Sequence, residues 1–335
     1  MSDTNQPIAI ALGADNTYAM PLAVTICSIL NNVSKKRTLH FYILDGGLSD
    51  KSKERLTNLF RHSRNKKHNI NLINANQDSI NSLPWRGYQS ESTYLRLLIP
   101  EVLPQHLRKV IYLDCDLILE ADITKLWEYN INKTIAWAAR SLLIQTLSHP
   151  AGVKNYTDYG GNADSPYFNA GVMVINLELW REEVISSKAI DYIQKNRKSI
   201  KLNDQEALNA VLIGKWRELD PRWNQQGPVF WPQLLPETGF TDAIMDIYEE
   251  LKNEPYVIHF LSSSKPWDFK CMHPLTHRFM YYLKQSCWFT KAGWMVWWAR
   301  LYMKRFSWLF RDLRKALNMI KVQNLQSIQQ NNNIS

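Results

Sequence analysis

Short apolar runs alternate with amphipathic stretches along the first 260 residues of the chain. The apolar runs are four to six residues long and rich in β-branched and aromatic side chains, which is typical of buried strands. They cover residues 8–13, 39–44, 70–73, 109–113, 135–139, 171–176 and 256–260. The stretches between them have helical periodicity and predict helices at 18–31, from 49 onward, and at 93–98, 179–196 and 204–213.

Strands that alternate with helices in this way predict crossover connections and an α/β fold with a mostly parallel sheet. No linker rich in Gly, Ser or Pro interrupts the first 260 residues, so we expect a single domain over residues 1–265. In open α/β sheets, ligands bind beyond the carboxyl ends of the strands. Acidic side chains follow three of the predicted strands at that edge, namely Asp15, Asp45 and the pair Asp114 and Asp116.

The positive charge of the protein is concentrated near its C-terminus. The 335 residues carry 40 Lys and Arg against 31 Asp and Glu, a formal net charge of +9. Residues 291–321 hold eight of the basic side chains and one acidic one, which leaves a surplus of only two elsewhere. Nucleic-acid enzymes more often spread positive charge over a groove in the folded body. We therefore expect no nucleic-acid partner.

The same C-terminal segment is rich in aromatic residues, with five of the 13 tryptophans between 288 and 308. On a helical wheel one arc is apolar and holds Trp294, Trp298, Leu301, Tyr302, Leu309, Leu313 and Ile320. The other arc is polar and holds Arg300, Lys304, Ser307, Arg311, Arg314 and Lys315. This pattern is typical of a helix in the headgroup plane of an anionic leaflet, and we assign 291–322 to a membrane surface. The alternative is a helix packed on the body or on a partner subunit.

The two ends of the chain give the remaining expectations about organisation. The last residues, 323–335, form a polar low-complexity stretch that predicts disorder. The first residues lack the positive and apolar regions of a signal peptide, and no apolar run is long enough to span a bilayer. The four cysteines form no CxxC pair. We expect a cytoplasmic protein with reduced thiols.

The pair Asp114 and Asp116 is the main candidate for chemistry. Carboxylates two residues apart point the same way along an extended chain, so together they can chelate one hard divalent cation that bridges nucleotide phosphates. A solvated loop is the alternative for the same residues. The sequence lacks the GxxxxGK[ST], GxGxxG, GxSxG and HExxH motifs, which disfavours P-loop ATPases, dinucleotide dehydrogenases, α/β-hydrolases and zincin proteases.

Six blocks of sequence together resemble one family. They are ALGADNTYAMPLAVTICSIL, YLRL, LDCDLIL, YFNAGVMVINLELWR, NDQEALNAV and HFLSSSKPW, in this order from residue 11 to residue 267. The chain resembles the retaining glycosyltransferases of family 8, which include lipopolysaccharide galactosyl- and glucosyltransferases and glycogenin. The resemblance implies a catalytic domain of the GT-A type over 1–265. A weaker likeness to the lipopolysaccharide core transferases implies a C-terminal extension over 266–290.

The resemblance also implies ligands and the residues that hold them. The ligands are Mn²⁺ (or Mg²⁺) and a UDP-glucose or UDP-galactose donor. The implied metal ligands are Asp114, Asp116 and His259. The implied donor-binding residues are Asp15 and Tyr18 at the uracil, Arg96 at the sugar or a phosphate, Asn169, Ala170 and Gly171 at the sugar, and Ser262 and Lys265 at the phosphates. The implied catalytic residues are Asp204, bound to sugar hydroxyls, and Gln205, below the anomeric carbon.

Several of these residues have ordinary structural alternatives. Asp15 is also a plausible turn residue, Arg96 a helix-surface residue, and His259 a core or capping histidine. Asn203 and Asp204 could equally cap a helix. Two further positions depart from the family: Ser262 stands where Gly is common, and Arg140 aligns loosely with an acceptor-binding Asp of some relatives, which would suit an anionic acceptor.

The resulting hypothesis is a retaining hexosyltransferase on the cytoplasmic face of the inner membrane. It would move glucose or galactose from a UDP-sugar to a lipid-linked oligosaccharide, namely lipopolysaccharide core. The amide of Gln205 is a poor nucleophile, which favours front-face attack by the acceptor over a covalent intermediate. The alternatives are the same chemistry on another glycan or a protein, a basic-tailed nucleic-acid-binding protein, and an inactive membrane-interaction module.

Overall fold

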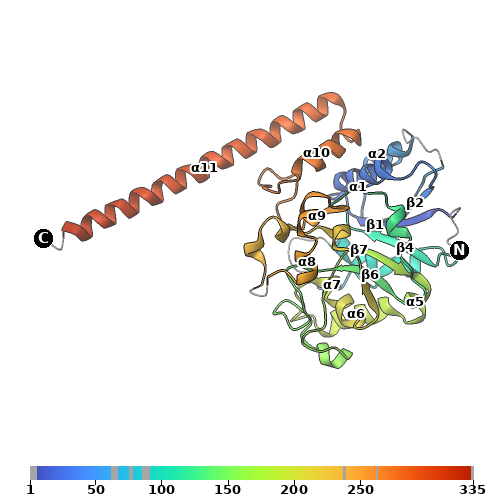
Figure 1. Ribbon diagram of the computed structural model, residues 1–335. Coiled ribbons are helices and arrows are strands. Elements are labelled where there is room, and N and C mark those ends of the chain that lie inside the picture. Colours follow the sequence, from blue (N-terminus) through green and yellow to red (C-terminus); the bar gives the residue numbers. More distant parts are fainter. Residues whose placement is uncertain are drawn as a thin grey trace.

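The computed structural model describes residues 6–61, 67–74, 78–84, 91–236, 239–261 and 263–332, the last stretch as backbone alone beyond 315. A globular α/β body comprises most of the chain, and one long C-terminal helix projects from it (Figure 1). The predicted α/β class is confirmed, since helices cover both faces of a central sheet.

The central sheet has seven strands in the order β3-β2-β1-β4-β7-β6-β8. In chain order these are β1 (Ile8–Ala14), β2 (Leu39–Asp45), β3 (Asn69–Ile73), β4 (Lys109–Leu113), β6 (Ala136–Arg140), β7 (Phe168–Asn176) and β8 (Trp216–Glu218). Strands β3, β2, β1 and β4 are parallel, and β6 and β8 are parallel. The sheet is therefore mostly parallel, as predicted.

Strand β7 is the exception, because it runs antiparallel to both β4 and β6. All nine of its residues are buried. A strand that is buried on both faces has a continuous apolar sequence in either direction, so its sequence does not reveal its orientation. The reversal carries Asn169 and Gly171, at the start of β7, to the edge where β4 ends.

A second, two-stranded sheet brings a distant segment to the same edge. Strand β5 (Leu117–Leu119) pairs antiparallel with β9 (Val257–His259), and Leu117 lies opposite His259. The hydroxyl of Thr25 donates to the carbonyls of Cys115 and Leu117, at 2.8 Å each, which fixes the turn between β4 and β5. His259 is therefore held beside the Asp114–Asp116 turn.

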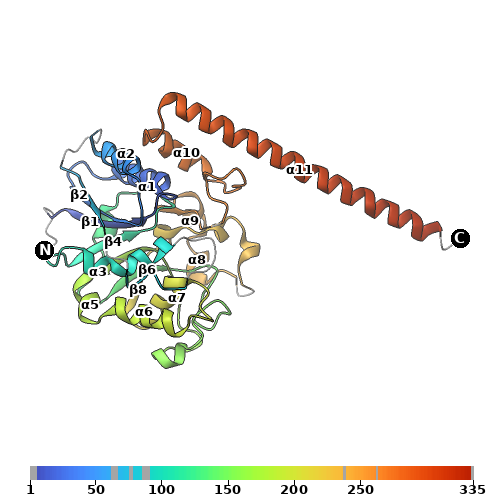
Figure 2. The same ribbon diagram turned by 180° about the vertical axis from the view of Figure 1, so that it is seen from behind.

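Two hydrophobic layers enclose the central sheet (Figures 1 and 2). On one face lie α1 (Ala19–Asn32), α2 (Asp50–Arg61) and α10 (Thr276–Gln285). On the other face lie the 3₁₀ helix η1 (Glu91–Leu98), α5 (Leu177–Glu182), α6 (Ile185–Lys195) and α7 (Asn203–Val211). The helix expected over 179–196 is thus two helices, separated where Val184 has a φ of +48°.

Short helices complete the body. They are α3 (Ile99–Val102), α4 (Thr124–Trp127), α8 (Asp242–Met245), α9 (Tyr248–Asn253) and the 3₁₀ helices η2 (Tyr156–Tyr159), η3 (Pro221–Asn224), η4 (Gly227–Val229) and η5 (Pro232–Leu234). A small apolar cluster joins α8, α9 and η4 through Val229, Ile244 and Leu251. This cluster lies apart from the two main layers of the core.

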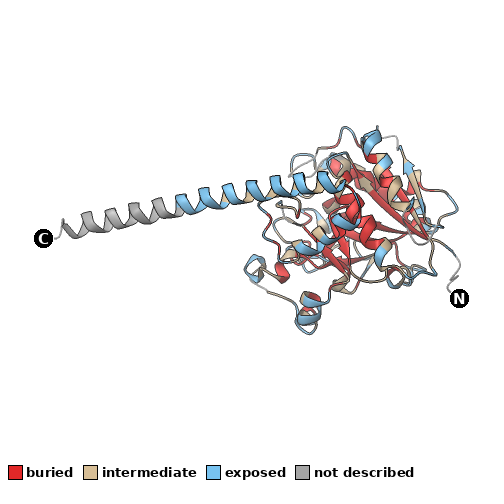
Figure 3. Ribbon diagram, turned by 90° about the horizontal axis from the view of Figure 1, so that it is seen from above, coloured by how far each residue is buried: buried red, intermediate tan, exposed pale blue. Residues whose placement is uncertain are grey.

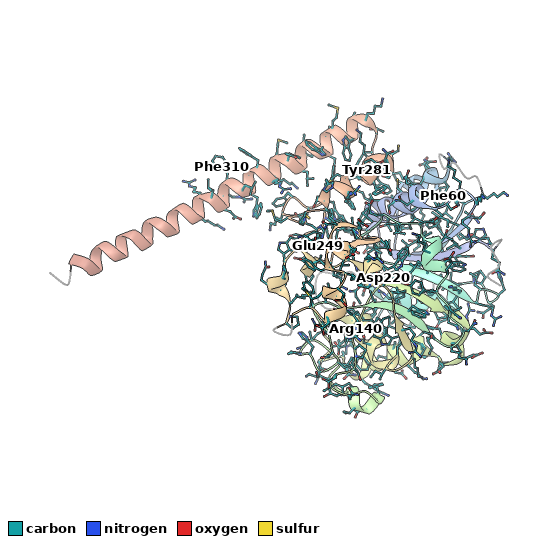
Figure 4. All side chains as sticks on the ribbon, viewed as in Figure 1. Phe60, Arg140, Asp220, Glu249, Tyr281 and Phe310 are labelled. Atoms are coloured by element: carbon teal, nitrogen blue, oxygen red, sulfur yellow. The ribbon has the colours of Figure 1, made fainter. Side chains whose placement is uncertain are left out.

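Helix α11 (Lys291–Asn332) is continuous over 42 residues and extends away from the body (Figures 1 and 3). It runs through residues 323–332, where the sequence predicted disorder. Its first turns pack on the body through Trp294 and Trp297, whereas Phe310 lies far from the body (Figure 4). Among the residues that the structure describes, no helix combines the length and the apolar character needed to cross a bilayer.

Candidate active site

The two aspartates after β4 and His259 of β9 form one cluster. Their ligand atoms all lie within 4.8 Å of one another. The Nε2 of His259 lies 3.3 Å from the Oδ1 of Asp116 and 3.8 Å from the Oδ2 of Asp114. Backbone hydrogen bonds fix both acidic residues, since the Asp114 N–H donates to Gly171 O and Asp116 O accepts from the Phe260 N–H.

The ring of His259 is oriented as a metal ligand would be. Its Nδ1 lies 2.8 Å from the Oδ1 of Asn224, an atom that can only accept, so Nδ1 carries the hydrogen. The lone pair is then on Nε2, which is buried and has no hydrogen-bond partner. An imidazole lone pair and two carboxylates that face one another are stabilised by a cation between them, so these three residues fit Mn²⁺ or Mg²⁺.

Gly171 allows the close approach of the cluster to β7. A Cβ at this position would lie 2.3 Å from the Cε1 of His259 and 2.9 Å from the Oδ2 of Asp114. Both separations are shorter than real Cβ contacts, so a larger residue would displace the side chains of His259 and Asp114. The backbone of Gly171 is not in the left-handed region, so the position does not require glycine for its conformation. It requires glycine because there is no room for a side chain.

Arg96 connects the cluster of Asp114, Asp116 and His259 to Asp204. Its Nη2 lies 2.9 Å from Asp114 Oδ1, its Nε lies 2.7 Å from Asp204 Oδ2, and its Nη1 donates to Ala170 O at 2.7 Å. The guanidinium is buried over the ring of Tyr112. Burial alone would lower the pKa of Arg96, but the two carboxylates outweigh it and raise the pKa above its usual range. The alternative of a helix-surface arginine is excluded.

Asp204 lies in the first turn of α7 and is buried. Its Oδ1 accepts from the Thr93 hydroxyl at 2.8 Å, in addition to the ion pair with Arg96. Burial raises the pKa of its carboxyl, and Arg96 opposes this shift. The helix cap position is Leu202, which makes no side-chain capping bond, so neither Asn203 nor Asp204 is a helix cap.

Gln205, on the next position of α7, connects to the start of β7. Its Oε1 accepts from the Ala170 N–H and from the Asn169 side-chain amide, at 3.1 Å each. Asn169 in turn accepts from the Gly171 N–H at 3.0 Å. The side chain of Gln205 is therefore fixed, with its oxygen engaged by two donors.

Lys265 pairs with Asp116, whereas Arg96 pairs with the other aspartate, Asp114. The Lys265 ammonium is 2.6 Å from Asp116 Oδ2 and donates to Phe260 O at 2.7 Å. Burial would raise the pKa of Asp116, but its charged surroundings, the ammonium of Lys265 first among them, outweigh burial and lower the pKa. Asp116 is thus held as a carboxylate.

The residues predicted at the uracil lie in the loop between β1 and α1. Asp15 accepts from the Thr17 and Tyr18 backbone N–H groups, at 2.8 and 3.1 Å, so it does serve the turn. Tyr18 contacts the edge of Trp267. Burial, followed by the charge of Asp116, raises the pKa of its hydroxyl above the usual range.

Two predicted positions require separate comment. Ser262 lies outside the described residues. Arg140, at the end of β6, forms an ion pair with Glu218 of β8 at the surface (Figure 4).

Asn224 is a site residue that the sequence did not reveal. It is buried at the end of η3 and hydrogen-bonds to both His259 and Asn169. Its segment reads Arg-Trp-Asn-Gln-Gln, which has no recognisable motif. Only the tertiary fold brings it to the site, through the bridge between Gln225 and Ile258 of β9.

Two carboxylates and an imidazole at the carboxyl edge of an α/β sheet form a set of side chains that could hold a divalent cation, and comparison with known proteins identifies the family. Residues 9–271 match the model of glycosyl transferase family 8, so the chain belongs to this family. It is 30% identical over 281 residues to general stress protein A of Bacillus subtilis, with 83% of this chain and 93% of that protein covered.

A lipopolysaccharide 1,2-glucosyltransferase of Escherichia coli is 24% identical over 287 residues, covering 85% of this chain and 80% of that protein. The galactosyltransferase LgtC, solved with donor and acceptor sugar analogs, superposes with a TM-score of 0.70 and 24% identity. That superposition covers 85% of this chain and 98% of LgtC. The fold is therefore of the kind found in this glycosyltransferase, as predicted.

Proposed function

We propose that this glycosyltransferase is a retaining hexosyltransferase that uses UDP-glucose or UDP-galactose. The observation that carries the proposal is the close approach of Asp114, Asp116 and His259, with Gln205 of α7 hydrogen-bonded to the start of β7. Family membership supports the donor class. The same three side chains would hold Mn²⁺ or Mg²⁺, which when bound neutralises the charge that develops on the departing diphosphate.

The remaining side chains would bind and orient the donor. Lys265 would contact a phosphate, because its ammonium is held at the edge of the metal cluster. Tyr18 and Asp15 would bind the uracil. Arg96 would contact the donor and would also hold Asp114 and Asp204 in place, since its N–H groups reach both carboxylates.

The start of β7 and of α7 would form the sugar subsite. Asn169, Ala170 and Gly171 would line it, and Asp204 would accept from sugar hydroxyls. Gln205 would lie below the anomeric carbon. We assign Ser262 to the phosphates on the family resemblance alone.

The fixed amide of Gln205 supports front-face substitution. Both donors to its oxygen withdraw electron density, so this oxygen is a poor nucleophile. In the proposed step, the bond from the anomeric carbon to the UDP oxygen breaks as the acceptor oxygen bonds to the same face. The acceptor proton passes to the departing phosphate oxygen. The configuration at the anomeric carbon is retained without a glycosyl–enzyme intermediate.

Helix α11 supports a lipid-linked acceptor, and lipopolysaccharide core is the acceptor we propose. The exposed apolar side chains of α11 include Trp298, Tyr302, Phe306, Phe310 and Leu313. Trp294 and Trp297 instead pack on the body. An exposed apolar face opposite basic side chains suits an anionic membrane surface. We propose that the enzyme works at the cytoplasmic face of the inner membrane.

Two alternatives differ in their predictions. Transfer to another glycan or to a protein would use the same donor site with a different acceptor. Nucleic-acid binding by the basic segment would require no metal cluster, and it predicts a steep fall of nucleic-acid affinity with salt.

A transfer assay tests the proposal. The full chain is incubated with Mn²⁺, a panel of nucleotide sugars and either extracted core oligosaccharide or unrelated glycans. We expect transfer from a UDP-hexose to core, with the anomeric configuration of the donor preserved in the product by nuclear magnetic resonance. A product of inverted configuration, or transfer from donors that release a nucleotide other than UDP, would contradict it.

A further inference from the structure

A chain of buried amides connects the metal cluster to Gln205. The Nδ1 of His259 lies 2.8 Å from Asn224 Oδ1, and Asn224 Nδ2 lies 2.8 Å from Asn169 Oδ1. Asn169 Nδ2 lies 3.1 Å from Gln205 Oε1. His259 and Asn224 are each 1% exposed, so water does not compete for these bonds.

Backbone groups of β7 set the donor and the acceptor in each of these side-chain hydrogen bonds. The N–H groups of Ala170 and Gly171 can only donate, and they donate to Gln205 Oε1 and Asn169 Oδ1. Asn169 must therefore present its NH₂ to Gln205. Asn224 must then present its NH₂ to Asn169 and its oxygen to His259.

Asn224, the last amide in this series of hydrogen bonds, determines the tautomer of His259. Because the Asn224 oxygen accepts, Nδ1 of His259 carries the hydrogen and Nε2 faces the carboxylates with a lone pair. The backbone position of Asn224 is also fixed, since Gln225 N–H donates to Val257 O and His259 N–H donates to Gln225 O.

We propose that Asn224 is a positioning residue with two separable tasks. Its oxygen sets the tautomer and the ring orientation of His259 for metal binding. Its NH₂ holds Asn169, and through it Gln205, for sugar transfer. This inference rests on the proposed function, because it assigns the tasks to the same metal and donor sites.

Two substitutions separate these tasks. In Asn224→Asp the carboxylate still accepts from His259 Nδ1 but faces the Asn169 oxygen as a second acceptor. Asn169 cannot flip without opposing its NH₂ to the Gly171 N–H. In Asn224→Ala both bonds are lost. Asn176→Asp is the matched control, because Asn176 is a buried asparagine that caps α5 and lies outside the chain of amides.

The tautomer is tested first, on the metal-free full chain labelled with ¹⁵N-histidine. Two-bond and three-bond ¹H–¹⁵N couplings distinguish Nδ1–H from Nε2–H. We expect His259 to be Nδ1–H in the native protein, in Asn224→Asp and in Asn176→Asp, and to populate Nε2–H in Asn224→Ala. An Nε2–H ring in the native protein would overturn the inference.

Metal affinity and turnover are then measured separately. Calorimetric titration with Mn²⁺ should give a Kd for Asn224→Asp within about threefold of native, and a Kd about 10–100-fold weaker for Asn224→Ala. With a UDP-hexose, kcat of Asn224→Asp should fall at least about tenfold, because repulsion displaces Asn169, one of the two donors to Gln205, while Asn176→Asp stays near native.

The outcomes also distinguish this inference from the proposed function. A native chain that binds no Mn²⁺ and releases no UDP overturns the proposed function. A native chain that does both, with Asn224→Asp behaving like Asn176→Asp in kcat, overturns the role of Asn224 alone. Equal loss of Mn²⁺ affinity in Asn224→Asp and Asn224→Ala would also overturn it, since the two tasks would not be separable.

Discussion

The Nη2 of Arg96 lies 2.9 Å from the Oδ1 of Asp114, and the arginine is enclosed by protein. Removing the guanidinium would leave the buried carboxylate of Asp204 and the partly buried carboxylate of Asp114 without their cation. We expect Arg96→Met to lower the free energy of unfolding by about 3–5 kcal/mol, measured by urea denaturation.

The control for this change is the exposed pair of Arg108 and Glu178. Arg108→Met should cost no more than about 1 kcal/mol, because exposed ion pairs contribute little. Similar losses in the two variants would show that Arg96 is no more than a surface cation.

Gly171→Ala should weaken metal binding without unfolding the protein. The added Cβ would lie 2.3 Å from the His259 ring and 2.9 Å from Asp114, so both must move. We expect Mn²⁺ affinity to weaken more than about tenfold in calorimetric titration. At Gly227 a Cβ would meet ordinary contacts at 3.6 Å, so Gly227→Ala is the control and should bind Mn²⁺ normally. Unchanged affinity in Gly171→Ala would refute the assigned cluster.

The parallel strands β1, β2, β3 and β4 were largely predictable from the sequence, whereas the pairing of β7, β6 and β8 was not. The apolar runs that become β1, β2, β3 and β4 are short, rich in β-branched residues and separated by helical periodicity. Strands β5 and β8 are only three residues long, too short for any period to appear. The division between α5 and α6 depends on a left-handed Val184, for which this sequence gives no local signal.

The site shows the same division between local and tertiary information. Asp114 and Asp116 were recognisable because both carboxylates follow an apolar strand. The roles of His259 and Gln205 came only from the family resemblance. Pairing of β5 with β9 brings His259 to the site, and hydrogen bonds from the start of β7 hold Gln205 of α7 there. Asn224 gave no signal, because its hydrogen-bond partners are 35 and 55 residues away in the chain.

His273 should make stability depend on pH in the acid range. Its buried ring contacts Phe230, Trp231 and Phe260, and burial lowers its pKa from 6.5 to about 4. The unfolded chain therefore binds a proton that the folded protein excludes. The corresponding stability is complete above pH 6.5 and is lost as the pH falls toward 4, by up to about 3 kcal/mol.

The measurement is the free energy of unfolding against pH for the native protein and for His273→Asn. The variant keeps an acceptor near the Leu275 N–H but cannot titrate. We expect a shallower slope between pH 6.5 and 4 for the variant, and a native slope for the exposed control His277→Asn. Parallel curves for all three proteins would contradict the assignment.

The exposed apolar face of α11 should govern membrane binding. Replacing Trp298, Phe306 and Phe310 by Ser removes three large exposed side chains, each worth about 1.5–3 kcal/mol when buried. We expect partitioning onto anionic vesicles to fall at least about 100-fold in sedimentation assays. Leu234→Ser, an equally exposed site on the body, should change nothing. A triple variant that sediments like the native chain would exclude α11 as the membrane contact.

Gln205→Ala tests the front-face mechanism. It removes the acceptor for the Ala170 N–H and the Asn169 amide, so the sugar subsite loses its order. We expect kcat with a UDP-hexose to fall about 10²–10³-fold while the Kd for Mn²⁺ stays near native. Mass spectrometry of the native enzyme in turnover should detect no glycosyl adduct. An adduct on Gln205 would contradict front-face attack.

The central claim is that Asp114 and Asp116 support metal-dependent use of a UDP-hexose. The most direct measurement is UDP release from UDP-glucose and UDP-galactose with and without Mn²⁺. It compares the native chain with Asp114→Asn/Asp116→Asn and with the exposed control Asp158→Asn/Asp164→Asn, which changes net charge equally. We predict Mn²⁺-dependent release by the native chain and the control, and none above background by the Asp114/Asp116 variant. Release without metal, or equal release by all three proteins, would contradict the account.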